Sequence, residues 1–260
     1  MEANLFDKIP AMPKLSSITI TGNEAANIAD CIDSLGFCDE RVVVDGGSKD
    51  DTVAIAEKHG ATVYHHPWTD HGTQKNIALS HATGDWILLL DADERVPPGL
   101  AAEIRKAMAD GDADGFEVPR LSLFCGRWMR HSGWYPDYVL RLFRRGRGHF
   151  SDHLVHTRVI CDGRVKRLAT PLTHFAIRRI HDSIAKMDSY STAGAAEIVA
   201  ASRTVKFSSG ITHGLWTFIR CYFLRLGFLD GREGFLLAVI NAEGTYYRYM
   251  KAWLTGRSRG

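Results

Sequence analysis

The sequence predicts an α/β fold: a mixed sheet flanked by helices, followed by C-terminal amphipathic helices. Three observations lead to this prediction. Residues 85–90 form an almost unbroken apolar run, which is typical of a strand buried on both faces of a parallel sheet. Strand patterns alternate with helix patterns from residue 15 up to this run. After residue 115, strand patterns rich in Arg, Trp and Tyr indicate that further strands join the sheet.

The first part of the chain repeats a strand-then-helix unit. Runs rich in β-branched and apolar residues predict strands at 15–21, 41–44 and 61–64. Apolar residues at helical spacing predict helices after these strands, at 25–35, 48–59 and 74–82. We expect Ser48 to cap the second helix and Gly60 to end it. This order is typical of parallel strands joined by right-handed crossovers.

The second part of the chain does not continue the regular strand-then-helix order. A helix is predicted at 98–109, with Pro97 and Pro98 near its first turn. Strands are predicted at 116–119, 138–143 and 156–161, and a helix at 183–201. Aromatic residues mixed with arginines predict amphipathic helices at 216–229 and 235–254. We therefore expect a sheet domain over residues 1–182 and a helical, membrane-associating region over 183–260.

Composition and charge narrow the class of protein. The chain of 260 residues is 45% hydrophobic and 24% charged with a net charge of +2, which is typical of a globular protein. No apolar stretch is long enough to span a membrane, and no signal peptide is expected. The five cysteines form no C-x-x-C pair, which fits a reducing compartment. Basic residues outnumber acids between Arg120 and Lys186, which suggests an anionic partner.

Acidic residues follow the predicted strands at 15–21, 41–44 and 85–90. Ligands of open α/β sheets bind beyond the carboxyl ends of the strands, and Asp91 and Asp93 lie there. Carboxylates at such a point suit a hard divalent cation bound to a diphosphate; the alternative is that they cap the next helix. The single glycine after the first strand disfavours a dinucleotide-binding turn. Lys75, near the start of a helix, can meet phosphate.

Four blocks of the chain carry a resemblance to a known family. They read ITITGNEAANIADCIDSL, VVVDGGSKDDTVAIAEKHGA, GTQKNIALSHATGDWILLLDADE and GWYPDYVLRLFRRGRGHFSDHLVH. Together they resemble glycosyltransferase family 2, and more narrowly its lipopolysaccharide inner-core β-1,4-glucosyltransferases. The resemblance covers about residues 15–254. It implies a GT-A fold, a nucleotide-sugar donor, a divalent metal (Mg²⁺ or Mn²⁺) at D-x-D, and inversion at the anomeric carbon.

The resemblance also implies roles for single residues. The donor is expected to be a UDP-sugar, UDP-glucose by resemblance, and the metal is expected on Asp91 and Asp93, chiefly Asp93. The expected nucleotide-sugar contacts are Thr21, Asn23, Glu24, Asp45, Gly47, Lys75, Asp91 and Ala92. Asp45 is assigned to the uracil or its ribose.

The general base is sought among the few acids between Arg120 and Lys186. Asp152 and Asp137 remain as candidates after acids in a turn and beyond the compact part are set aside. Asp152 is preferred, because it follows an arginine cluster (Arg141, Arg144, Arg145 and Arg147) that would hold a phosphorylated acceptor. It also precedes Thr157, where many relatives carry Glu. The alternative is that Asp152 only pairs with those arginines.

The resemblance further implies a partner and a location. The acceptor is expected to be a phosphorylated lipid A–core glycolipid, with heptose as the accepting sugar. We expect a protein of the cytoplasm, peripheral on the anionic surface of the inner membrane, and no nucleic-acid partner. Two alternatives stay open: a nucleotidyltransferase, which would release diphosphate, and a catalytically silent protein that binds glycolipid at the membrane surface.

Overall fold

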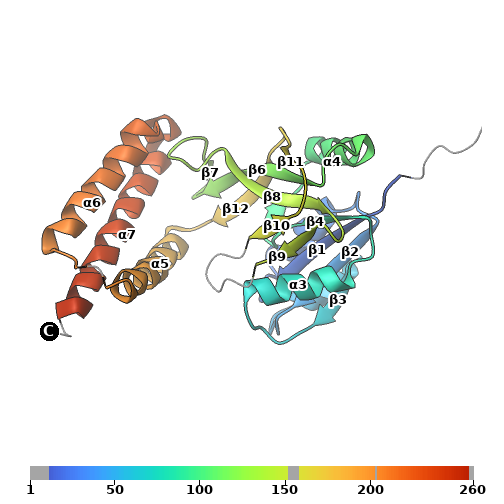
Figure 1. Cartoon of the computed structure of the whole chain (residues 1–260), viewed down its shortest axis with the longest axis horizontal. Coiled ribbons are helices and arrows are strands. Elements are labelled where there is room, and N and C mark those ends of the chain that lie inside the picture. The colour runs from blue at the N-terminus through green and yellow to red at the C-terminus, as the bar shows by residue number, and fades with distance from the viewer. Residues whose placement is uncertain (1–11, 152–157, 203, 258–260) are drawn as a thin grey trace, which may run out of the picture. The chain divides into compact units, whose positions relative to one another are not determined.

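The computed structural model describes residues 12–151, 158–202 and 204–257 (Figure 1). The chain forms two compact units, residues 1–120 with 138–173 and residues 121–137 with 174–260. The chain therefore passes between the units more than once, within β6 (Gly115–Phe124), β8 (Asp137–Arg144) and β12 (Leu172–Ile177). The predicted boundary at residue 182 stays a prediction.

The sheet has the predicted mixed α/β character, and this fold class is confirmed. Its first strands are β1 (Leu15–Thr21), β2 (Glu40–Asp45), β3 (Thr62–His65) and β4 (Trp86–Leu89). The strand order is β3-β2-β1-β4-β8-β6-β12-β5. β1 pairs in parallel with β2 and β4, and β3 in parallel with β2, whereas β8 runs antiparallel to β4. The carboxyl ends of β1, β2 and β4 consequently meet at one edge.

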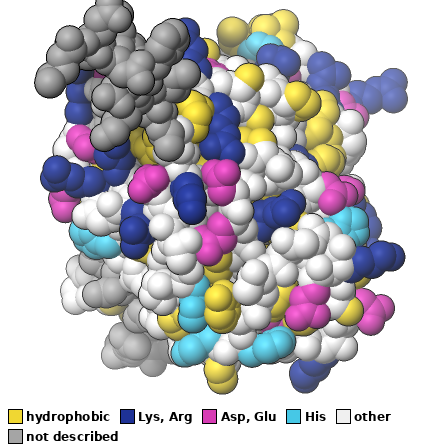
Figure 2. Space-filling view, turned by 90° about the vertical axis from the view of Figure 1, so that its right-hand side faces the viewer, with side chains coloured by type: hydrophobic (Ala, Val, Ile, Leu, Met, Phe, Trp, Pro, Cys, Tyr) yellow, Lys and Arg dark blue, Asp and Glu magenta, His cyan; other side chains and the backbone are white. Residues whose placement is uncertain are grey.

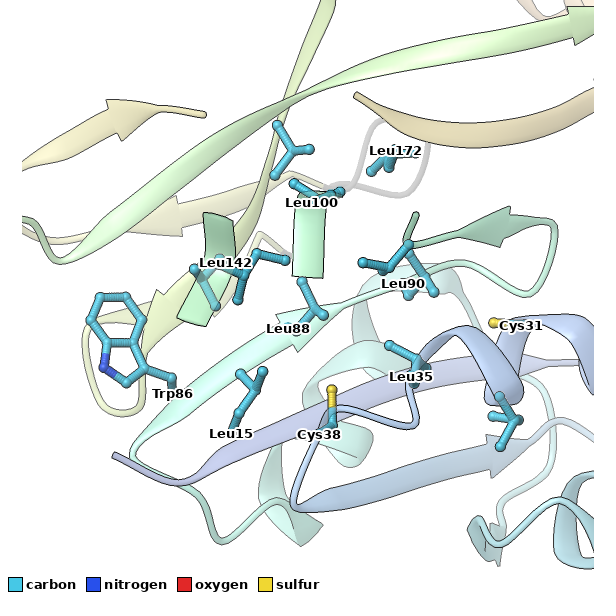
Figure 3. Close-up of a cluster of buried hydrophobic side chains, with 14 of the residues drawn as sticks. Leu15, Cys31, Leu35, Cys38, Trp86, Leu88, Leu90, Leu100, Leu142 and Leu172 are labelled. Atoms are coloured by element: carbon cyan, nitrogen blue, oxygen red, sulfur yellow. The ribbon is translucent and has the colours of Figure 1, made fainter. Parts of the chain in front are cut away.

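Both faces of β1 and β4 are buried by side chains of the flanking elements, whereas β3 at the edge is partly exposed. The helices of this unit are α1 (Ile28–Ser34), α2 (Thr52–Lys58), α3 (His71–His81) and α4 (Pro98–Asp110). Leu88 and Leu90 lie in one core with residues of α1 and α4, as Figure 3 shows. Ile87 and Leu89 lie in a second core with Ala78 of α3. Burial on both faces explains why this strand is apolar without alternation.

The remaining strands are short. They are β5 (Glu94–Arg95), β7 (Arg127–Trp128), β9 (Gly148–Phe150), β10 (Val159–Cys161) and β11 (Val165–Arg167). β9 and β10 form a separate two-stranded sheet. On the face drawn in Figure 2, acidic and basic side chains are interspersed.

The second unit is mainly helical. It contains α5 (Ile180–Ala200), α6 (Phe207–Ile219) and α7 (Gly231–Arg257). A π-helical turn, η1 (Arg220–Leu224), and a 3₁₀ turn, η2 (Gly227–Asp230), join α6 to α7. Its core joins Phe124 and Met129 to Leu237 and Ile240 of α7. Within the described residues, no helix is long and apolar enough to cross a membrane.

Two local predictions are wrong. The predicted helix at 216–229 is interrupted, because Leu226 adopts a φ of 55° and Gly231 a φ of 66°, which turn the chain between α6 and α7. Ser48 does not cap α2, whose first residue follows Asp51. Ser48 instead hydrogen-bonds with Asp45 and accepts from the backbone of Asn23.

Candidate active site

The predicted site residues that end or follow β1, β2 and β4 lie at one edge of the sheet. Thr21 and Asp45 are paired residues at the ends of β1 and β2. The backbone N–H of Leu90 donates to Ile18 of β1 at 3.1 Å, so Asp91 follows directly at the same edge. The predicted convergence of these strand ends is therefore present.

Two loops at this edge are joined by hydrogen bonds. The backbone N–H of Asn23 donates to Ser48 Oγ at 2.9 Å, and the N–H of Lys49 donates to Asn23 Oδ1 at 2.9 Å. The N–H of Glu24 donates to Thr52 Oγ1 at 2.8 Å. Asn23 adopts a φ of 58°, which asparagine tolerates better than most residues. These bonds hold the loops after β1 and β2 in one arrangement.

Asp45 organises the second of these loops. Its Oδ2 accepts the backbone N–H groups of Gly47 and Ser48, each at 3.0 Å, and His65 Nδ1 lies 3.5 Å from the same oxygen. Burial acts to raise the pKa of Asp45, but the hydrogen bonds from Ser48 and Gly47 outweigh it and lower the pKa. A charged carboxylate is thus fixed at the end of β2, where it can still accept a further hydrogen bond.

Asp91 is held between two cations. Lys75 Nζ of α3 lies 3.0 Å from Oδ1, and Arg141 Nη2 of β8 lies 2.6 Å from Oδ2. Burial acts to raise the pKa of Asp91, but Arg141 and Lys75 hold it well below its usual range. Lys75 lies in the second turn of α3, which begins at His71 rather than at the predicted residue 74.

Glu94 is a second partner of Arg141. It is fully buried, and its Oε1 accepts from Arg141 Nη2 at 2.5 Å and lies 3.5 Å from Arg120 Nη1. Its Oε2 accepts the backbone N–H of Asp91 at 3.1 Å. Glu94 therefore fixes both the backbone of Asp91 and the arginine that pairs with its side chain. The sequence analysis missed this role, although the run D-A-D-E contains the residue.

The other two residues of the D-x-D run differ in burial. Ala92 is buried in the core, and Asp93 is partly exposed. Among the described residues, no group of three or more His, Cys, Asp or Glu side chains is placed to hold a metal ion. Mg²⁺ sites in proteins commonly take some of their ligands from bound phosphates.

The predicted arginine cluster is divided by the strand direction. β8 pairs Arg144 with Trp86 at the start of β4, so the turn after Arg144 lies at the opposite edge from Asp91. Arg144 stacks on the Trp86 ring at 4.6 Å. The expectation that Arg141 clusters with the arginines after it is wrong, because the extended strand β8 separates Arg141 from Arg145. Phosphate binding by Arg144, Arg145 and Arg147 stays a prediction.

The structure describes only one of the two candidate bases. Asp152 and Thr157 lie outside the described residues. Asp137 is the first residue of β8. Asp152 is preferred from the sequence because it follows the expected arginine cluster. Since Arg141 lies apart from the other arginines, this reason is weakened, and the choice between the two acids stays a prediction.

The chain is similar in sequence to known glycosyltransferases. The model of "Glycosyl transferase family 2" matches residues 16–162. An "Uncharacterized glycosyltransferase" of Rickettsia felis is 31% identical over 256 residues, covering 92% of this chain and 89% of that one. The "Lipopolysaccharide core biosynthesis glycosyltransferase LpsC" of Rhizobium meliloti is 31% identical over 261 residues, covering 93% and 94%.

A solved structure is also similar over part of the chain. It is a glucosyl-3-phosphoglycerate synthase from Mycobacterium tuberculosis in complex with Mn²⁺, UDP and glucosyl-3-phosphoglycerate. The match has a TM-score of 0.37 and 26% identity, and it covers 43% of this chain and 44% of that one.

The pairing of Arg141 with Glu94 predicts a large loss of stability in Arg141→Met. The substitution leaves buried Glu94 without its nearest counter-charge, and breaking a buried ion pair costs about 3 kcal/mol or more. Urea unfolding followed by far-ultraviolet circular dichroism measures the change. Arg144→Met on the same strand is the control, because the arginine it removes is half-exposed and stacks on a ring. An equal loss in both variants would contradict the role of the pair.

Proposed function

Because the chain belongs to glycosyltransferase family 2, we propose that it is an inverting, metal-dependent hexosyltransferase that uses a UDP-sugar. The proposed donor is UDP-glucose, and the proposed acceptor is a heptose of a phosphorylated lipid A–core glycolipid. The observation that carries the proposal is the shared edge of β1, β2 and β4, where Asp45 ends β2 and Asp91, paired with Lys75, follows β4. The similarity to LpsC over 93% of the chain supports the acceptor class.

The loops after β1 and β2 are proposed to hold the uridine. Their cross-links through Asn23 and Ser48 keep the pocket in place before the donor binds. Asp45 is charged and fixed, so it can accept a hydrogen bond from the uracil or the ribose without reorganising its own loop. A preorganised acceptor of this kind lowers the entropic cost of binding.

The acidic run after β4 fits a divalent cation that shares its ligands with the diphosphate. Asp93 is proposed as the main protein ligand, with Asp91, which Lys75 and Arg141 orient, nearer the ribose or bridging through water. The cation would supply charge neutralisation for the departing diphosphate. Lys75 supplies a further positive charge at the same edge, and Arg141 keeps Asp91 oriented and ionised.

The acceptor hydroxyl needs a carboxylate to take its proton. A general base acts best when it is not bound to a metal, so we propose that it lies outside the D-x-D run. Asp152 and Asp137 remain the two proposals for this role. Binding on the cytoplasmic surface of the inner membrane is proposed as well, since a lipid-linked acceptor would be reached there.

The uridine assignment predicts that Asp45→Ala weakens UDP binding about ten- to a hundred-fold, because a charge-assisted hydrogen bond is lost. Isothermal calorimetry measures the affinity. Ser48→Ala is the matched control, since it removes the hydroxyl that bonds Asn23 and Asp45 but keeps the carboxylate. If Asp45→Ala binds UDP as tightly as the wild type, Asp45 does not contact the nucleotide.

The metal assignment predicts that Asp93→Asn loses turnover and loses the gain in UDP affinity that Mn²⁺ or Mg²⁺ gives the wild type. The reason is that a neutral amide is a poorer ligand than a carboxylate for a hard cation. Calorimetry with and without the metal separates this from misfolding. Full wild-type turnover after exhaustive chelation would refute the metal role, and release of diphosphate instead of UDP would indicate nucleotidyl transfer.

The base assignment predicts that Asp152→Asn lowers the transfer rate by ~10²–10⁴ while UDP and metal binding are kept. Asp137→Asn is measured beside it, with a panel of nucleotide sugars and a purified core glycolipid. If Asp152→Asn transfers normally and Asp137→Asn is inactive, the base is Asp137.

A further inference from the structure

Helix α6 packs two glycines against α7 and leaves large apolar side chains beside them exposed. Gly210 and Gly214 face α7 so closely that an added Cβ would lie 3.2 Å from the carbonyl oxygens of Tyr246 and Ala242. Phe207, Ile211 and Leu215, spaced four residues apart, are 51%, 51% and 60% exposed. A helix whose outer face is apolar differs from the usual surface helix, whose outer face is polar.

The turn after α6 continues this apolar surface in sequence. Five of its large side chains are between 45% and 63% exposed: Phe223, Leu224, Leu226, Phe228 and Leu229. We call these five residues the apolar tip. Large apolar groups clustered on a protein surface mark sites of interaction with a partner or a membrane.

The charged side chains within α6 and the apolar tip are basic, whereas the exposed Glu243 of α7 lines one groove with Ile211 and Leu215. The sequence has no Asp or Glu between Lys206 and Leu229. The charged residues along it are basic and exposed: Lys206, Arg220 and Arg225, followed by Arg232. Apolar side chains with a basic border match the apolar interior and anionic head groups of a bilayer.

We propose that α6 and the apolar tip form a surface that binds an anionic lipid bilayer, with the tip inserted among the head groups. Exposed large apolar groups supply the insertion energy, and the four cations supply the selectivity for anionic lipid. The surface requires no helix that spans the membrane.

The same turn also holds a loop of the second unit. Asp230 is buried, and its Oδ2 accepts the backbone N–H groups of Arg130 at 3.1 Å and His131 at 2.8 Å. The carbonyl of Arg225 accepts the N–H of Ser132 at 2.9 Å. A bilayer that fixes the apolar tip should therefore also fix the loop at 130–132. This loop leads toward Asp137, a proposed base, and only this consequence rests on the proposed function.

Sedimentation with lipid vesicles tests the surface. We expect the full chain to bind vesicles of equal parts phosphatidylglycerol and phosphatidylcholine, and to bind more weakly as salt rises. Leu224→Asp with Phe228→Asp should weaken binding about a hundred-fold or more. Each of Lys206→Gln, Arg220→Gln and Arg232→Gln should weaken binding to anionic vesicles about five-fold and leave binding to neutral vesicles unchanged.

The matched control introduces two aspartates into the first unit, as the tip variant does into the second. Ile160→Asp with Val165→Asp changes two exposed apolar residues of the first unit, and it should bind vesicles as the wild type does. Equal binding by the tip variant and the wild type would overturn the proposal. So would a concentration-dependent dimer in sedimentation that the tip variant abolishes, since the surface would then be covered by a second copy.

Hydrogen exchange tests the link between the tip and the loop. The amides of Arg130, His131 and Ser132 should exchange about ten-fold more slowly on anionic vesicles, and less so in Asp230→Asn. Unchanged exchange in vesicle-bound protein would overturn the link. Calorimetry of UDP binding in solution is independent of both tests, so failure of the surface and failure of the proposed glycosyl transfer are distinguishable.

Discussion

The candidate site depends on one buried guanidinium. Arg141 lies between Asp91 and Glu94. The burial of Arg141 and Glu94 is tolerable because the two are paired, since an unpaired charge in a protein interior costs several kcal/mol. The network joins β8 to the segment after β4, and through Lys75 it also reaches α3. Any ligand at this edge therefore meets carboxylates whose positions are set before it binds.

Much of the first unit follows from local sequence patterns. The predicted strand at 15–21 and the predicted helix at 98–109 match β1 and α4 to within one residue. These patterns are readable because burial on one or both faces imposes its own periodicity on the chain. The acids at the strand ends were predicted for the same reason: parallel strands bring their carboxyl ends together.

Contacts between distant segments could not be predicted from the sequence. Arg141 and Glu94 are 47 residues apart, and only the antiparallel pairing of β8 with β4 shows that they meet. That pairing also separates Arg141 from the arginines that follow it in sequence. Likewise, the periodicity at 216–229 gives no sign of Asp230, whose bonds to the loop at 130–132 accompany the turn where a continuous helix was expected.

The pairing register of β8 constrains which changes of chain length the protein can accept. β8 pairs Leu142 with Leu88, and successive side chains of a strand point to opposite faces. Deleting one residue between Leu142 and the end of the strand would move Arg141 to the apolar face beside α4 and put a leucine opposite Asp91. The turn at Gly146, by contrast, has open space around it and can lengthen without moving the guanidinium. Natural length variation should therefore collect in that turn and spare the strand.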